Sequence, residues 1–435
     1  MADPSDIAHL LRRTEFVARP TRVSELTALT LAQAVDNVLD FGLNGNAPLP
    51  ASLGGPPPGG NWNQYVEACN WWVGEMVSKP RPFQEKMTLF WHGHFVSSWW
   101  DVDEGYHMMW QNQLYRTMAL GDFVALAQAM ALEPAMLVYL SNGDNVKSSP
   151  NQNFARELME LFLLGVDNYT EQDVEASAAA WTGYNYDYNT KQYVYRAHKH
   201  NNNDKTFFGT TKPWTGPQII DEILVNNAAK QLIAAKFISK KLWEFLAHVG
   251  PPAGVVDALA AVFVSNGMQL LPLLRALLNR PEFYSTTAKQ GLVRSPIEWF
   301  VALCVQTGVT PSQMGLSWRG EMLGQSIFNP PNVSGWRSNG YWLNTSALSG
   351  RAGVARSVTW HLRSGPQFNF LNDFTPSAAV DYVADYLGIS PLSTLTRNAL
   401  INAQVAERAS TNYKNYWAPT NLLTMSMLAP EFHMA

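Results

Sequence analysis

The chain has 435 residues, which suits about three domains of ordinary size or one large domain. Charged residues make up 15% of the chain and the formal net charge is −4, with no long run of either sign. A general nucleic-acid binder carries a strongly basic face, so this composition speaks against that class of protein. The 46% of hydrophobic residues speaks against a disordered chain.

The sequence as given predicts a cytoplasmic protein, or an exported one if an upstream signal was trimmed. Its N-terminal residues lack the basic start and apolar run of a signal peptide. No stretch reaches the roughly 18 uninterrupted apolar residues that a membrane span needs. The two cysteines, Cys69 and Cys304, lie in apolar helical patterns. Buried thiols are therefore expected at both positions, although a disulfide between them stays open.

Apolar residues at helical spacing predict helices over most of the chain. Residues 3–41 are expected to form two helices, with Asp3 or Ser5 capping the first. Residues 42–62 hold many Gly and Pro residues, which is typical of a loop. Further helices are expected at 62–78, 83–95, 108–120, 121–132, 153–165, 173–183, 219–248, 252–265, 268–279, 295–307, 313–323 and within 376–428.

One region breaks the helical period. Tyrosines recur at every second position over 184–188 and return at positions 193 and 195. That alternation predicts a β-hairpin with its turn near Asn189. The predicted fold is mainly α. One large multi-helix domain spans 1–435, a β-hairpin lies near 184–200, and the insertion of hairpin and loop extends over 184–210.

Two carboxylates stand out on the predicted helix at 153–165. Glu157 and Glu160 lie three residues apart, so they share one face of the helix beside an apolar stripe. A buried carboxylate must be paired, bound to a metal or protonated. The pair is therefore a candidate for acid–base chemistry, alone or with an acidic residue of the segment 101–104. The alternative is a structural Arg–Glu brace, with Arg156 nearby.

Histidines supply candidate ligands and proton carriers. His92 and His94 flank Gly93 at the end of a predicted helix, and His200 follows the hairpin. In a continued helix, residues two apart diverge by about 200°, so His92 and His94 would share a metal only if the helix ended at Gly93. The alternatives are a His that caps helix carbonyls and a His in a solvated loop.

A joint site is predicted from these groups. His94, Glu157, Glu160 and His200 are the expected catalytic residues. The same four with His92 are the expected ligands of a divalent metal such as Zn²⁺, Mn²⁺ or Fe²⁺. A Glu-x-x-His spacing at 104–107 has no second copy to match it, so a carboxylate-bridged metal bundle is disfavoured.

The aromatic and amide residues suggest a binding surface. The chain holds 16 Trp and 16 Tyr, and the stretch 328–351 combines Pro and Gly with aromatic and Asn residues. This stretch is expected to form an ordered loop that covers the site. The alternatives are a structural clasp and aromatic residues that fill the core. The residues expected to bind substrate are Trp91, Arg156, Asn332, Trp336, Trp342 and Asn344.

Six segments in the same order carry a family resemblance: FWHGHFVSS (90–98), NQNFARELMELFLLGV (151–166), HNNNDKTFFG (200–209), FISKKLWEFL (237–246), RSPIEW (294–299) and the loop at 324–351. Together they resemble the bacterial domain-of-unknown-function family numbered 1800, over roughly residues 8–430. The resemblance implies a predominantly helical fold and no securely attached activity, and it implies that many relatives are exported. The chain departs from the family at Phe162 and at His200-Asn201, where relatives often carry His and His-Asp.

The expected function is hydrolysis of a polar, carbohydrate-containing substrate by a Glu/His site. Two alternatives stay open, a redox-active metal protein and a non-catalytic binding or assembly protein with a protein partner. The motifs of phosphate-binding loops, dinucleotide folds, nucleophile elbows and zinc proteases are absent from the sequence. The corresponding reactions are therefore disfavoured. Small polar molecules or glycans are the expected ligands, without nucleic acid and without a membrane span.

Overall fold

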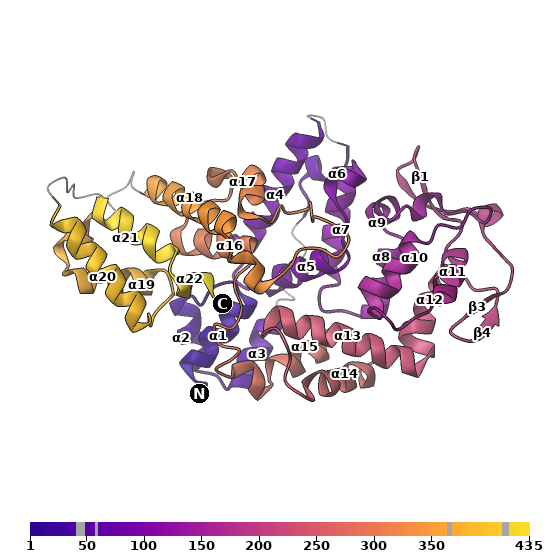
Figure 1. The fold of residues 1–435 in the computed structure, drawn as a ribbon, viewed down its shortest axis with the longest axis horizontal. Coiled ribbons are helices and arrows are strands. Elements are labelled where there is room, and N and C mark those ends of the chain that lie inside the picture. Colours follow the sequence, from indigo (N-terminus) through magenta and orange to yellow (C-terminus); the bar gives the residue numbers. More distant parts are fainter. Residues whose placement is uncertain (41–47, 57–59, 363–367, 411–416) are drawn as a thin grey trace.

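Helices form most of the computed structural model, which describes residues 1–40, 48–56, 60–362, 368–410 and 417–435 (Figure 1). The first half holds α1 (Pro4–Thr14), α2 (Pro20–Thr27), α3 (Leu31–Leu39), α4 (Asn61–Ser78), α5 (Phe83–His94), α6 (Trp99–Val102), α7 (Gly105–Thr117), α8 (Phe123–Ala131), α9 (Pro134–Tyr139), α10 (Asn153–Glu157), α11 (Glu171–Ala180) and α12 (Gly216–Asp221). The second half holds α13 (Ala228–Leu246), α14 (Val255–Ser265), α15 (Leu270–Leu278), α16 (Pro296–Thr307), α17 (Leu316–Leu323), α18 (Thr345–Leu362), α19 (Pro376–Tyr386), α20 (Thr394–Arg408), α21 (Trp417–Met427) and α22 (Pro430–His433).

Short 3₁₀ and π segments connect these helices. The 3₁₀ turns are η1 (Ala51–Leu53), η2 (Asn142–Asp144), η4 (Ala197–Lys199), η6 (Pro281–Tyr284), η7 (Ser312–Met314), η8 (Asn339–Trp342) and η9 (Asn369–Asp373). The two π segments are η3 (Leu158–Leu163) and η5 (Glu222–Asn226). In the part of the chain covered by these elements, every helix falls short of the length and apolar character that a membrane span requires.

The mainly α prediction is confirmed, with two local corrections. Residues 3–41 were expected to hold two helices, but three form there, because Thr30 and Gln33 make a capping box that starts a new helix. The predicted loop at 42–62 lies partly outside the described residues; its described part includes a single turn of 3₁₀ helix, η1, and the start of α4. Asp3 caps α1 as predicted.

The β-hairpin prediction is also confirmed. β1 (Tyr184–Asp187) and β2 (Gln192–Tyr195) pair antiparallel, with Tyr184 opposite Tyr195. A second hairpin, β3 (Lys205–Phe207) and β4 (Thr210–Lys212), follows within the predicted insertion. Both hairpins lie at one end of the molecule, beside the helices α8–α12 (Figure 1).

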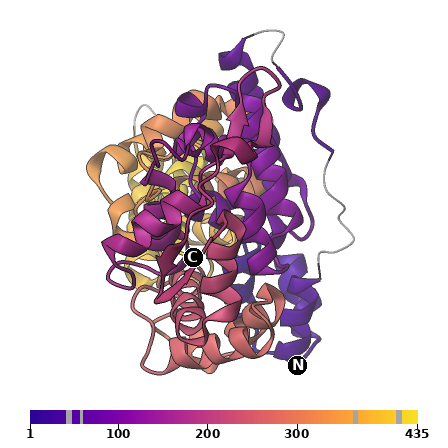
Figure 2. The same cartoon turned by 90° about the vertical axis from the view of Figure 1, so that its right-hand side faces the viewer.

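Two hydrophobic clusters make up the core, and α5 contributes to both. The first cluster joins α1, α3 and α8 with η3 and α13–α15. The second joins α4 and α16–α21. α3 packs against α15, and both lie on the lower side in the two views (Figure 1, Figure 2). Phe90 on α5 belongs to the first cluster and Leu89 to the second, so α5 marks their boundary.

A buried ion network fixes α5 to its neighbours. Glu85 is 0% exposed, and its carboxylate accepts two hydrogen bonds from the Arg116 guanidinium at 2.7 and 2.8 Å. Lys79 Nζ and Trp72 Nε1 donate to the same carboxylate at 2.6 and 2.9 Å. Burial alone would raise the pKa of Glu85, but Arg116 and Lys79 outweigh burial and hold it below its ordinary value.

Glu133 is a second buried carboxylate, and its hydrogen-bond partners among the described residues are neutral groups. It caps α9 by accepting from the Met136 backbone N–H at 3.2 Å, and Gln111 Nε2 donates to it at 3.1 Å. Burial raises the pKa of Glu133 to about 8, against the partial opposition of these hydrogen bonds. Between its ordinary pKa and about 8, the folded protein therefore holds a proton that the unfolded chain has lost.

Glu133→Gln is expected to flatten the pH dependence of stability. In the wild-type protein the contribution of Glu133 is fully present below the ordinary carboxyl pKa of 4.5, and it is lost as pH rises through about 8. In the variant, the part of this decrease in the free energy of unfolding that comes from Glu133 should be absent, since Gln does not ionise. Urea unfolding at pH 5, 7 and 9 measures the slopes. Parallel slopes for the two proteins would show that Glu133 does not titrate in this range.

Candidate binding pocket

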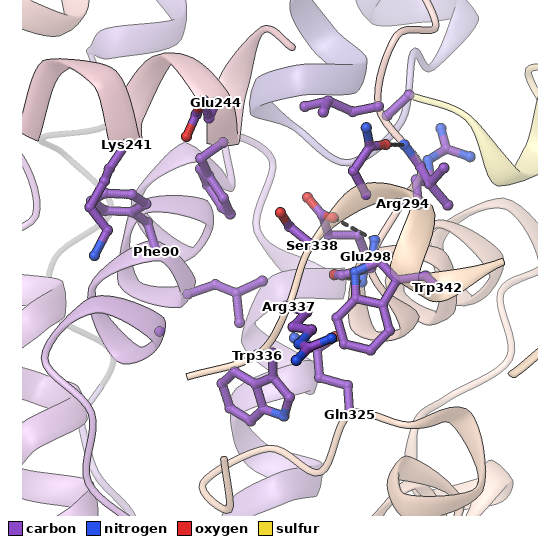
Figure 3. A pocket seen from close by; sticks show the side chains of 18 of the residues that line it. Phe90, Lys241, Glu244, Arg294, Glu298, Gln325, Trp336, Arg337, Ser338 and Trp342 are labelled. Atoms are coloured by element: carbon purple, nitrogen blue, oxygen red, sulfur yellow. Dashed lines mark hydrogen bonds between the residues drawn. The ribbon is translucent and has the colours of Figure 1, made fainter. Parts of the chain in front are cut away.

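One cavity of the described structure lies at the boundary between the two hydrophobic clusters. Its volume is about 220 Å³, and we call it the central pocket. α1, α5 and α13 line it, together with residues 292–298 and the loop at 325–342. Figure 3 shows Lys241, Glu244 and Phe90 on one side, and Arg294 and Glu298 on the other. The pocket therefore joins segments that are far apart in the sequence.

Two buried arginines line the pocket without an ionic partner. Arg13 is 2% exposed and Arg294 is 4% exposed. Arg13 Nη2 donates to the backbone O of Ala288 at 2.6 Å, and Arg294 Nη1 donates to the backbone O of Phe432 at 2.8 Å. The Nε atom of each is buried without a hydrogen bond, and neither guanidinium pairs with a carboxylate of the described residues.

The electrostatics around these arginines are positive. Burial and the charge of Arg12 lower the pKa of Arg13 to about 9. Burial and the charges of Arg12, Arg13 and Arg351 likewise lower the pKa of Arg294 to about 9. Lys86 lies close enough that, besides burial, the charges of Arg13 and Arg294 lower its pKa as well. Because these cations repel one another, binding of an anion between them is favoured.

Glu298 does not neutralise the two arginines, because its own oxygens are already engaged. Its Oε2 accepts from the backbone N–H of Ser295 at 2.8 Å in the capping box that starts α16. Its Oε1 contacts the ammonium of Lys86. The lysine thus compensates the charge of Glu298, whereas Arg13 and Arg294 form no ion pair among the described residues.

The opposite wall holds Lys241, Glu244 and His94. Burial lowers the pKa of Lys241 to about 8, with Glu244 acting against it. Lys241 Nζ lies 3.4 Å from the backbone O of Leu161. His94 Nε2 lies 2.9 Å from the backbone O of Phe162, the next residue. Both carbonyls belong to the π segment η3, whose hydrogen-bond pattern differs from that of an α-helix.

The contact with Phe162 fixes the tautomer of His94. A carbonyl oxygen only accepts, so Nε2 carries the proton and Nδ1 is left as a bare acceptor. Nδ1 is buried and has no hydrogen-bond partner. Burial and the charge of Lys241 hold the pKa of His94 well below its ordinary value. The ring is therefore neutral, and its Nδ1 can accept a hydrogen bond.

His92 has a different role from the metal ligand that the sequence suggested. α5 continues through His94, so the two histidines diverge, as expected for a continuous helix. His92 Nε2 accepts the backbone N–H of Phe328 at 3.1 Å, and burial lowers the pKa of His92 to about 3. Its ring packs against Trp72 and Trp336. His92 thus anchors the 325–342 loop to α5.

The other predicted catalytic residues lie outside the central pocket. Glu157 is half-buried, and burial and the charge of Glu160 raise its pKa. Glu160 Oε2 accepts from the Tyr169 hydroxyl at 2.5 Å. His200 is buried, and its Nδ1 donates to the backbone O of Thr182 at 2.7 Å. Of the four predicted catalytic residues, His94 alone lines the central pocket.

The predicted metal site is wrong as a ligand set. Among the residues that the structure describes, no three His, Cys, Asp or Glu side chains lie close enough together to hold a metal ion. His92, His94 and His200 each direct a ring nitrogen to a backbone group instead. The spacing in sequence was compatible with a site, but these backbone contacts separate the imidazoles.

The predicted substrate-binding residues divide into two groups. Trp336 and Trp342 line the central pocket. They also line a neighbouring open groove of about 800 Å³, which Asn332 lines as well. The other three have structural contacts. Trp91 is fully buried and donates to the backbone O of Ala119, so that assignment was wrong. Asn344 accepts from the backbone N–H of Ala347 at the start of α18.

Arg156 is the remaining member of this set. It pairs with Glu171 Oε1 at 2.6 Å, and both side chains are largely exposed. This contact differs from the predicted alternative, an Arg–Glu brace made by Glu157 or Glu160, because its carboxylate comes from Glu171. Arg156 does not line the central pocket or the groove.

Gly335→Ala is expected to displace the loop that carries Trp336. Gly335 has φ +77°, and a Cβ there would lie 2.7 Å from the backbone O of Gly93 on α5. The strained conformation and the close approach both oppose a side chain. Gly340→Ala is the matched control, because a Cβ at that position meets nothing within 4 Å. Intrinsic tryptophan fluorescence and the melting temperature should change in the first variant only; equal changes would contradict this.

The residues of the pocket that sequence reasoning missed lie inside segments that carried the family resemblance. RSPIEW contains Arg294 and Glu298, and FISKKLWEFL contains Lys241 and Glu244. Arg13 is an exception, because it lies outside these segments, on α1. A search for cations inside the shared segments, instead of for His and Glu alone, would have found most of the pocket.

The chain was compared with curated proteins, solved structures and family models. No curated protein and no solved structure matches the chain. One family model, described as "Protein of unknown function (DUF1800)", matches residues 9–434. That match covers nearly the whole chain, including α1, α5, α13 and the 325–342 loop that form the pocket. The chain therefore belongs to the DUF1800 family.

Proposed function

We propose that this protein binds a small acidic molecule in the central pocket. The observation that carries the proposal is the pair of buried guanidinium groups of Arg13 and Arg294, which have no carboxylate partner among the described residues. A buried charge without a partner costs several kcal/mol, on the order estimated for isolated ions in proteins. Two such charges beside one cavity are explained by a ligand that supplies the missing anion.

The chemistry of arginine narrows the anion to a carboxylate or a phosphate. The planar guanidinium matches both groups and donates two parallel hydrogen bonds to them. In this protein each Nε–H is still unbonded, so each arginine has a donor to offer. Lys86 and Glu298 compensate each other, so they add no competing anion.

The remaining walls suit a polar ring that bears the acid. Trp336 and Trp342 supply aromatic surface, while His94 and Glu244 supply an acceptor each. A pocket with aromatic walls and a few convergent polar groups is the usual form of a small-molecule site. These features support a binding protein, in which His94 Nδ1 can accept a hydrogen bond from the ligand.

Isothermal titration with glucuronate and with glucose tests the proposal. The two sugars share a ring and differ by the carboxylate, so glucose is a matched neutral control. We expect glucuronate to bind with a dissociation constant of about 1 mM or lower, as two charge-assisted hydrogen bonds would give. Glucose should not bind in the same range. Equal affinity for both sugars, or binding of neither glucuronate nor inorganic phosphate, would contradict the proposal.

A further inference from the structure

The central pocket and the neighbouring groove share one wall. Trp336, Arg337 and Trp342 line both cavities. In the view of Figure 3, the Arg337 side chain lies between the two indole rings. Arg337 is itself exposed, and its guanidinium lies 5.4 Å from the ring centroid of Tyr341. A ligand that fills the pocket and passes this wall would therefore enter the groove.

The sizes of the two cavities indicate that the pocket holds only part of a ligand. The pocket measures about 220 Å³, below the roughly 300–1,000 Å³ that is usual for small-molecule sites. The groove measures about 800 Å³ and is open to solvent. One acidic ring suits the pocket, and the groove has room for further rings.

The groove differs from the pocket in its chemistry. Its polar residues are mostly neutral amides and hydroxyls, among them Asn329, Asn332, Ser326 and Ser334. Asn332 Oδ1 accepts from Ser334, which leaves the Asn332 amide hydrogens for other acceptors. Neutral amides and hydroxyls beside aromatic rings match the hydroxyl groups and apolar ring faces of a sugar.

Glu321 disfavours a second acidic group at its end of the groove, whereas the groove's cation, Arg337, lies on the wall shared with the pocket. Glu321 lines the groove but not the central pocket, whereas Arg13 and Arg294 line the pocket but not the groove. A ligand with acid groups along its whole length would place one of them beside Glu321. A ligand with a single acid at one end fits both cavities.

Backbone and side-chain contacts hold the wall in place without any ligand. Phe328 donates its backbone N–H to His92, and Trp99 donates its backbone N–H to the backbone O of Phe328 at 2.8 Å. Tyr65 donates its hydroxyl to the backbone O of Ile327 at 3.1 Å. The loop that leads to the wall is thus anchored at residues 327 and 328 on α4, α5 and α6.

We infer that pocket and groove form one site for an oligosaccharide that carries a single acidic sugar at its end. The acidic sugar lies in the pocket between Arg13 and Arg294, and neutral sugars extend over Trp336 and Trp342 toward Tyr341 and Asn332. This inference rests on the proposed function and adds the class of ligand. A nucleotide, which also joins an anion to a flat ring, is the competing ligand, but its single base leaves most of the groove empty.

Titration of the wild-type protein with four ligands tests the inference. The ligands are glucuronate, glucuronosyl-xylobiose with the acid at its non-reducing end, neutral xylotriose, and AMP. We expect the acidic trisaccharide to bind about tenfold more tightly than glucuronate, as one or two additional hydrogen bonds would give. Xylotriose and AMP should bind more weakly than the acidic trisaccharide.

The variant Tyr341→Ala tests whether the additional affinity for the trisaccharide comes from the groove. Tyr341 is 52% exposed and lines the groove alone, so its removal should reduce the affinity for the trisaccharide to that for glucuronate and leave glucuronate unaffected. Tyr188 lies in the β1–β2 hairpin region and has the same 52% exposure, so Tyr188→Ala is the matched control. It should change neither the affinity for glucuronate nor that for the trisaccharide.

The outcomes distinguish failure of this inference from failure of the proposed function. Equal affinity for glucuronate and the trisaccharide would overturn the inference and leave the proposed function standing, as would tighter binding of AMP. Binding of none of the acidic ligands would overturn both.

Discussion

Replacing Glu85 by Gln is expected to lower the free energy of unfolding by about 3–5 kcal/mol, the cost of breaking a buried ion pair. The substitution keeps the shape of the side chain and removes its charge. Arg116, which is 0% exposed, and Lys79, which is 8% exposed, would then lack the carboxylate that both now contact. Since these contacts fix α5 to α4 and α7, the whole helical core should be affected.

Urea unfolding followed by circular dichroism measures this effect. Glu171→Gln is the control, because it removes one partner of the exposed pair with Arg156 and should leave the unfolding midpoint unchanged. The stabilising effect of Glu85 should also decline as pH falls through its lowered pKa, since protonation removes the same charge. A midpoint for Glu85→Gln equal to that of the control would contradict the account of the network.

Arg13→Met and Arg294→Met are expected to weaken ligand binding without lowering stability, whereas Glu85→Gln is expected to lower stability. Each should weaken glucuronate binding by about 10- to 100-fold, because a hydrogen bond to a charged group contributes about 1.5–3 kcal/mol. Neither should lower the free energy of unfolding, because each removes a buried charge that has no ionic partner in the described structure. Loss of binding without loss of stability would identify Arg13 and Arg294 as ligand-binding residues.

Titration and urea unfolding of the same protein samples measure both quantities. Arg275→Met is the control, since Arg275 is 48% exposed on its side chain and pairs with Asp36 outside the central pocket. It should leave glucuronate binding unchanged. If Arg13→Met or Arg294→Met unfolds as readily as Glu85→Gln while binding glucuronate normally, the two arginines are structural residues and the pocket is not a binding site.

The helical fold could be predicted because its signals are local. Asp3 caps α1, and the alternating tyrosines form β1 and β2, as the sequence indicated. The third helix within 3–41 was missed, since the capping box at Thr30 lies inside a continuous apolar pattern. The π segment η3 also has no known signature in spacing, yet it directs two carbonyls toward His94 and Lys241.

The site could be predicted only in part, because burial and partners are not visible in a sequence. His94, Trp336 and Trp342 were chosen for their chemistry and do line the central pocket. Glu157 and His200 were chosen for the same reason but lie outside it; Glu157 is half-buried near Glu160, and His200 is hydrogen-bonded to the backbone O of Thr182. Arg13 and Arg294 are meaningful only because they are buried together without a carboxylate. Hydrolysis of a polar substrate stays a prediction.

A crystal structure of the glucuronate complex is the most direct test of the central claim. We predict that the glucuronate carboxylate lies within hydrogen-bonding distance of the guanidinium groups of both Arg13 and Arg294, with the sugar ring toward Trp336 and Trp342. A carboxylate bound anywhere else on the protein, with the central pocket holding only water, would contradict the account.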